Sequence, residues 1–149
     1  MLLKDLLPDL QIAIGPVILI SGVGLLLLSM TNRLGRTIDR SRQLVDAKRG
    51  AADDERQRFD AQLAILWRRA RLQRAAIILA AAAALLASTL IIVLFIGALL
   101  SLQVVFPIIA LFVSCMVAII ASLLCFMRDI DLALHALALE LIIQQRPTR

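Results

Sequence analysis

The chain has 149 residues, of which 61% are hydrophobic and 18% charged, and it carries a net charge of +5. A water-soluble domain of this length cannot hide so much apolar surface, so the composition excludes an ordinary soluble globular protein. Leu, Ile and Ala supply the hydrophobicity in runs of about 20 residues, the length that crosses a bilayer as a helix. The composition therefore predicts an all-α membrane protein.

The first apolar run, residues 12–30, contains no charged side chain. No small-residue cleavage site follows it, so we expect a retained transmembrane span rather than a cleaved leader. Gly15 and Pro16 lie near its outer end, where a kink is expected.

The next segment, residues 31–74, is highly charged. It holds twelve of the sixteen Lys and Arg residues and six of the eleven acids. Apolar residues recur at helical spacing (Leu34, Ile38, Leu44 and Val45), so the first span is expected to continue as a helix beyond the membrane. Gly50 suits the end of that helix, and Asp53 or Asp54 suits the N-cap of the next. The segment therefore predicts a helical hairpin whose second arm runs into the second span.

The second span is expected over residues 75–102 and the third over residues 107–127, with a short uncharged turn between them. Pro107 suits the first turn of the third helix. A Leu- and Ala-rich helix follows over residues 129–146. Together with the hairpin 31–74, it predicts a cytoplasmic helical bundle beneath a three-helix membrane layer, all in one domain, 1–149.

The distribution of charge predicts the orientation. The loop 31–74 holds twelve Lys and Arg residues, and the turn 101–107 holds none. Positive residues stay on the cytoplasmic side of a membrane. We therefore expect the N-terminus outside and the C-terminus in the cytoplasm.

A seam of mostly small and apolar residues runs along one face of the first span, at spacings of three and four. Its members are Gln11, Gly15, Ile18, Gly22, Leu25, Ser29, Asn32 and Arg36. One interpretation is close packing against the other helices of the same subunit, since small residues let backbones approach. The other is a pore around a symmetry axis, in which Ile18 and Leu25 are hydrophobic constrictions that gate by dewetting. Polar rings would then flank the pore: Gln11 or Asp9 outside, and Arg33 or Arg36 at the inner mouth.

Arginine rather than lysine dominates the start of the charged segment, at Arg33, Arg36, Arg40 and Arg42. Guanidinium groups favour fixed, forked contacts. One interpretation is a surface that binds anionic lipid headgroups. The other is an internal ion-pair network, in which Asp39 pairs with the neighbouring helix and Arg33 or Arg36 reaches Asp129 or Asp131. Nucleic-acid binding is not expected, because nothing resembles a reading motif.

Trp67 lies beside Arg68 and Arg71, about two turns below the second span. Packing of Trp67 inside the cytoplasmic bundle is the first expectation, and binding of a lipid headgroup by these three residues is the alternative. In the second span, the alanine-rich run 75–87 predicts tight helix contacts.

Features of enzymes, carriers and metal proteins are missing from the sequence. No ionisable residue lies in the middle of a span, where coupled transporters usually need one. Cys115 and Cys125 lie in an apolar run without metal or disulfide spacing, and the one histidine, His135, has no ligand-forming neighbours. We expect no catalytic site, no metal and no cofactor.

Three stretches of the sequence resemble a known family: residues 15–42 (GPVILISGVGLLLLSMTNRLGRTIDRSR), 63–72 (LAILWRRARL) and 126–130 (FMRDI). They are similar to a family of small bacterial membrane proteins known as domain of unknown function 2721. The resemblance covers nearly the whole chain. It implies three helices and a bacterial inner membrane, and it implies no activity.

Assembly is expected because three spans make a thin bundle and the C-terminal helix is apolar on two faces. A helix that is apolar on two sides has two partners, which predicts a cyclic homo-oligomer. The first expected function is a channel-like pore for small ions, lined by the first span. The alternative is a non-conducting scaffold or regulator whose basic cytoplasmic bundle binds anionic lipid or a protein partner.

Overall fold

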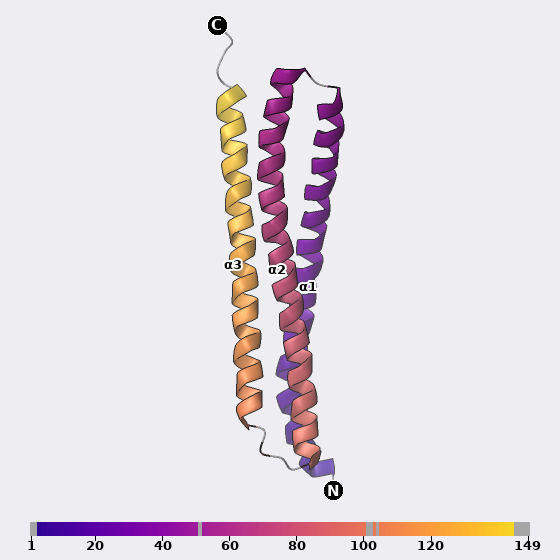
Figure 1. Ribbon diagram of the computed structural model, residues 1–149. Helices are drawn as coiled ribbons and strands as arrows, with labels where there is room; N and C mark the ends of the chain where they lie inside the picture. Colours follow the sequence, from indigo (N-terminus) through magenta and orange to yellow (C-terminus); the bar gives the residue numbers. More distant parts are fainter. Residues whose placement is uncertain (1–2, 51, 101–102, 104, 145–149) are drawn as a thin grey trace. The chain divides into compact units, whose positions relative to one another are not determined.

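Three long helices make up the protein. The computed structural model describes the backbone of residues 3–50, 52–100, 103 and 105–144, and the side chains of residues 14–50, 52, 55–100, 103 and 105–134. The helices are α1 (Leu3–Arg49), α2 (Asp53–Leu100) and α3 (Val105–Gln144) (Figure 1). The described residues contain no strand. The predicted all-α fold with three long helices is confirmed.

Each helix contains a stretch that is long and apolar enough to cross a membrane. The stretches are Ile14–Arg49, Glu55–Leu100 and Val105–Leu134. Folding buries only 11%, 22% and 11% of their most apolar windows. Apolar surface that remains uncovered on this scale needs lipid or a partner. All three helices are therefore able to span a membrane, as a multi-pass membrane protein requires.

The predicted spans continue into the predicted charged arms without a break. α1 ends at Arg49, where the Gly50 amide donates to the Ala47 carbonyl at 3.3 Å. The Ala52 carbonyl accepts from the amides of Glu55 and Arg56 at 3.1 and 3.0 Å. Gly50 thus follows the helix end as predicted. Ala52, rather than Asp53 or Asp54, occupies the N-cap, because its carbonyl accepts the first bond of the new helix.

α3 shows the same continuity. It begins at Val105, two residues before Pro107, and continues through Arg128 and Asp129 to Gln144. The predicted third span and the predicted C-terminal helix are therefore one helix. Residues 101–102 of the predicted second span and 145–146 of the predicted last helix lie outside the described residues.

A seven-residue repeat defines the buried face of each helix. The buried side chains are Val23, Met30, Thr37 and Leu44 in α1, and Cys115, Ser122 and Asp129 in α3. In α2 the spacing alternates between three and four, through Gln73, Ala76, Ala80, Ala83, Ala87 and Leu90. A repeat of seven keeps one seam of a helix facing its neighbours, as in coiled coils.

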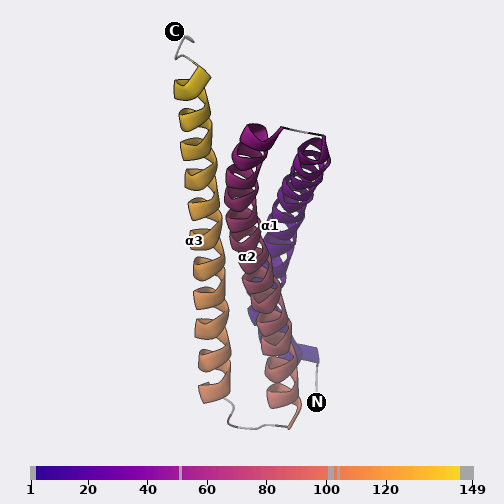
Figure 2. The same cartoon turned by 45° about the horizontal axis from the view of Figure 1, so that its top comes forward.

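The chain divides into two compact units, and every helix contributes to both. Unit 1 comprises Met1–Ser29 and Ile77–Ser122, and unit 2 comprises Met30–Ala76 and Leu123–Arg149. The ribbons of Figure 2 allow each helix to be followed through its two segments.

Unit 1 packs around small side chains. Ala83, Ala87 and Cys115 form its buried centre, and larger aliphatic residues of all three helices pack against them. The Cys115 thiol donates a hydrogen bond to the Ala83 carbonyl, with a sulfur–oxygen distance of 3.2 Å. Such an approach of α3 to the α2 backbone needs small residues at the contact. The tight contacts predicted for the alanine-rich run 75–87 are confirmed.

In unit 2 the end of α1 and the start of α2 form a hairpin (Figure 1). An ion pair between Lys48 and Asp60 joins the two arms near the turn. Asp39, which was expected to pair with the neighbouring helix, forms no ion pair among the described residues. Its side chain is exposed, because the buried position on this turn of α1 belongs to Thr37.

Candidate functional site

Asp129 is the only charged side chain that is fully buried within the described residues, with 0% exposure. Arg69 Nε lies 3.3 Å from its Oδ1, and Gln73 Nε2 donates to its Oδ2 at 2.9 Å. Arg33 Nη2 lies 3.4 Å from Oδ2. One carboxylate of α3 therefore binds side chains of both α1 and α2 in unit 2. We refer to Asp129, Arg33, Arg69 and Gln73 as the Asp129 cluster.

The register of the helices places these groups together. Asp129 continues the seven-residue repeat of α3, and Gln73 begins the buried seam of α2. Arg69 lies four residues before Gln73, on the same helical face. The Arg33 guanidinium also lies over the ring of Phe126, 4.9 Å from its centroid, and this cation–π contact holds it beside α3.

The cluster leaves an excess of positive charge. A buried carboxylate is tolerated only when donors replace the water that it has lost, and here three side chains do so. The side chains of Arg33 and Arg69 are 25% and 20% exposed, so each guanidinium retains some hydration. Because two positively charged arginines share one negatively charged aspartate, one of the two positive charges is not neutralised within the cluster.

The three donors of the Asp129 cluster also line a hollow of about 390 Å³ between α1 and α2. Its full lining is Arg33, Arg36, Thr37, Arg40, Leu66, Arg69 and Gln73. Arg36 and Arg40 are exposed and form no ion pair among the described residues. We call this site the arginine hollow; it presents four guanidinium groups from two helices.

A second hollow, of about 970 Å³, lies between α2 and α3. It is lined by Trp67, Arg68, Arg71, Leu72, Ala75, Arg128, Asp131 and Leu132, and we call it the tryptophan hollow. Trp67 is 70% exposed, so its predicted packing inside the bundle is wrong. Its neighbour Leu66 is partly buried instead. Consecutive side chains point about 100° apart around a helix of 3.6 residues per turn, so Trp67 points away from the packed face.

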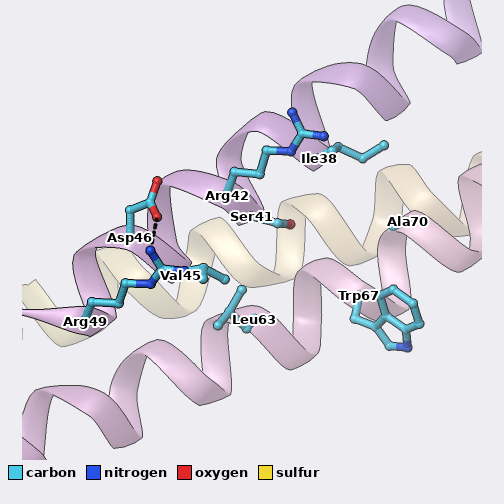
Figure 3. Close-up of a pocket in the computed structure, with 9 residues that line it drawn as sticks. All are labelled: Ile38, Ser41, Arg42, Val45, Asp46, Arg49, Leu63, Trp67 and Ala70. Carbon is cyan, nitrogen blue, oxygen red and sulfur yellow. Dashed lines mark ion pairs between the residues drawn. The ribbon is translucent and has the colours of Figure 1, made fainter.

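Trp67 also borders a third, more apolar hollow of about 660 Å³. Figure 3 shows Arg49 directed at Asp46 on α1, and the Trp67 ring projecting from α2. Ile38 and Val45, which were expected to lie on the packed face of α1, are 41% and 42% exposed and line this hollow. The packed face uses Thr37 in place of Ile38, whereas Leu44, which was also expected on this face, is buried as predicted.

One protein-family model matches most of the chain. A family model described as "Protein of unknown function (DUF2721)" matches residues 13–139. The chain belongs to this family. The predicted family is thereby confirmed, and the match spans the Asp129 cluster and all three hollows of the DUF2721 chain. No curated protein and no solved structure matches it.

The pore-lining candidates of this DUF2721 protein lie on an exposed face of α1. Ile18 and Leu25 are 66% and 69% exposed, and nothing lies within 4 Å of where a Cβ would sit on Gly15 or Gly22. Ser29 is exposed too. Packing of this seam within one subunit is therefore wrong. The buried repeat is offset by one residue, so it faces about 100° away.

The remaining pore candidates differ in what surrounds them. Arg33 belongs to the Asp129 cluster, and Arg36 is exposed in the arginine hollow. Gln11 and Asp9 belong to α1, but their side chains lie outside the described residues.

The predicted lipid-binding residues separate into two sites. Arg33, Arg36 and Arg40 line the arginine hollow, and Trp67, Arg68 and Arg71 line the tryptophan hollow. The predicted ion pair of Arg33 with Asp129 is confirmed.

Sequence reasoning missed Arg69, Gln73 and Arg128 as members of these sites. A signal for the first two existed. They are four residues apart, just before the alanine seam of α2, and an acid at the end of an apolar run requires partners. Within the described residues, no group of three or more His, Cys, Asp or Glu side chains could hold a metal ion.

Proposed function

We propose that this DUF2721 protein is an integral membrane protein whose arginine-rich unit 2 binds anionic lipid headgroups, as a scaffold or regulator of the membrane. The arginine hollow supports the proposal. Four guanidinium groups surround about 390 Å³, and two of them pair with the single carboxylate of Asp129. Arg36 and Arg40 keep their donors for a ligand, and a phosphate accepts such donors in a forked, charge-assisted geometry.

The proposed location is the inner membrane of a bacterium, with the N-terminus outside and the charged segment 31–74 and the C-terminus in the cytoplasm. Positive residues concentrate on the cytoplasmic side, and that leaflet attracts them through its anionic lipids. Arg33 and Arg128 follow the ends of apolar runs within a few residues. Both hollows would then lie close to the level of the lipid headgroups.

Labelling of single cysteines tests this orientation. With Cys115 and Cys125 replaced by alanine, Gly50→Cys should react with an impermeant maleimide only after the cells are lysed. Gly50 tolerates the change, because nothing lies within 4 Å of its Cβ position. Gln103→Cys, in the turn between α2 and α3, is the matched control and should react in intact spheroplasts. The opposite pattern at the two sites would reverse the proposed topology.

Loss of the free arginines should weaken the association with anionic lipid. The double variant Arg36→Gln/Arg40→Gln should lower the preference for phosphatidylglycerol over phosphatidylcholine by about fivefold or more, since each arginine near an anionic surface contributes about 1 kcal/mol. The motionally restricted fraction of the two spin-labelled lipids, measured in reconstituted vesicles, gives this preference directly.

The control removes the same charge outside the hollow. Arg56→Gln/Arg58→Gln changes two exposed arginines on α2, so it matches the charge loss without altering the arginine hollow. A preference that falls equally in both variants would reflect net charge alone and refute a built site. A native protein without any preference for phosphatidylglycerol would end the proposal.

A second candidate function is a channel-like pore for small ions. The exposed seam of α1 favours it, because Ile18 and Leu25 are mostly exposed, nothing lies within 4 Å of the Cβ positions of Gly15 and Gly22, and the seam is available to another copy. A cyclic homo-oligomer would bring these faces around one axis. Ile18 and Leu25 would then be the narrow, dewetted positions.

A further inference from the structure

The tryptophan hollow differs from the arginine hollow in the chemistry of its lining. Its basic residues are Arg68, Arg71 and Arg128, but it also contains an acid, Asp131, and the exposed ring of Trp67. A site for a purely anionic group gains nothing from a carboxylate and an aromatic face. Both of these groups are instead suited to a cation.

We propose that the tryptophan hollow binds a phospholipid headgroup that joins a phosphate to a primary ammonium, the ethanolamine phosphodiester. The inference rests on the proposed binding of headgroups by unit 2, and it adds a ligand of different charge at a second site. The phosphate lies among the arginines, and the ammonium lies between Asp131 and Trp67.

The arginines suit the phosphate end of this ligand. Arg68 and Arg71 lie three residues apart on one face of α2, and Arg128 comes from α3, so donors approach from two helices. All three side chains are exposed. Guanidinium groups that converge from two sides can contact more than one phosphate oxygen.

The acid and the ring suit the ammonium end. Asp131 already interacts within the described chain, but a carboxylate has about four acceptor positions, so it still accepts bonds from an ammonium. Trp67 is 70% exposed, and tryptophan is the best aromatic partner for a cation. A choline headgroup retains the cation but has no N–H donor, and a glycerol headgroup has no cation. The arrangement therefore selects a primary ammonium over both.

The remaining lining residues suit the rest of a lipid. Leu72, Ala75 and Leu132 are apolar and partly buried, and α2 continues from Ala75 into its long apolar run. A lipid whose headgroup lies in the hollow can thus extend its acyl chains along the apolar surface of the helices. The volume, about 970 Å³, is at the upper end of ordinary ligand pockets.

Fluorescence of Trp67 tests the proposal, because it is the only tryptophan of the chain. The full-length protein is reconstituted in phosphatidylcholine vesicles containing phosphatidylethanolamine, phosphatidylcholine or phosphatidylglycerol with acyl chains brominated close to the headgroup. Quenching measures the association of each lipid near Trp67. Phosphatidylethanolamine should associate about threefold more strongly than phosphatidylcholine, because only its ammonium donates a hydrogen bond to Asp131, and a net hydrogen bond at a hydrated site contributes a factor of this size.

Two variants separate the acid from the net charge. Asp131→Asn should remove the preference for phosphatidylethanolamine over phosphatidylcholine and strengthen the association of phosphatidylglycerol. Asp39→Asn, an exposed acid on α1 that lines none of the three hollows, should change neither. Equal association of the two zwitterionic lipids in the native protein, or identical behaviour of the two variants, would overturn the inference.

Two further measurements distinguish a lipid from a free solute as the source of the headgroup, and failure of this inference from failure of the proposed function. Displacement of the brominated lipid by millimolar glycerophosphoethanolamine would support the same headgroup chemistry with a free solute as the ligand, and no displacement would support the lipid. Absence of the ethanolamine preference, with the spin-label preference for phosphatidylglycerol intact, would remove this inference alone. Absence of the spin-label preference removes the proposed function instead.

Discussion

Replacing Asp129 by asparagine is expected to lower the free energy of unfolding of unit 2 by about 3 kcal/mol, the lower part of the range for breaking a buried ion pair. The substitution keeps the size of the side chain but removes the charge that Arg33 and Arg69 share. The two guanidinium groups are then left beside each other, three-quarters or more buried, without an anion. Hydrogen exchange of the hairpin amides in detergent micelles should become about 100-fold faster, since each 1.4 kcal/mol is a factor of about ten.

Asp131→Asn is the matched control for this prediction. It makes the same change two residues along α3, where the side chain is exposed, and the expected effect on stability is within about 0.5 kcal/mol. Arg69→Gln should cost less when Asp129 is already asparagine, because both changes remove the same interaction. Additive effects of the two changes, or equal effects at Asp129 and Asp131, would show that the carboxylate does not hold the three helices together.

The lengths of the helices follow from local signals in the sequence. No proline lies between Met30 and Lys48, and Gly35 alone does not interrupt the helix, so the first span continues until Gly50 follows it. The apolar runs are long enough to identify three spans, and the uncharged turn before Pro107 separates the last two. These features depend on propensity and hydropathy, which are properties of neighbouring residues.

The buried face of α1 does not follow from such signals. Gly15, Gly22 and Ser29 repeat every seven residues, and so do Val23, Met30 and Thr37, one position later. In a membrane, lipid-facing and packed faces have similar polarity, so hydropathy does not choose between two adjacent repeats. Beyond the span, Thr37 is buried although it is polar, because its hydroxyl donates to the Arg33 carbonyl at 3.1 Å and needs no other partner.

The candidate sites were predictable to the extent that they depend on one helix. The arginines of α1 and the Trp67 group of α2 are evident as clusters along the chain. Which residues of other helices complete them depends on the register between helices. Arg69 and Arg128 enter the two hollows only because the seven-residue repeats of α2 and α3 bring them beside those clusters.

Opening the proposed pore should have the largest effect on function. Ile18→Ser and Leu25→Ser replace exposed apolar side chains of the α1 seam by small polar ones. If these side chains form a dewetted constriction, the hydroxyl lowers the cost of filling it with water, and ion leak should rise about tenfold or more, equivalent to about 1.4 kcal/mol of barrier. Proteoliposomes loaded with an ion-sensitive dye measure the leak.

The control for this experiment is a serine on a different helix. Val117 on α3 is 59% exposed, so Val117→Ser places the same polar group on an apolar surface away from the α1 seam. A pore lined by α1 predicts leak in the Ile18 and Leu25 variants and none in the Val117 variant. Leak in all three would mean that a polar residue simply perturbs the bilayer. Absence of leak in all three would refute a pore lined by α1, and the exposed seam would then face lipid or a non-conducting partner.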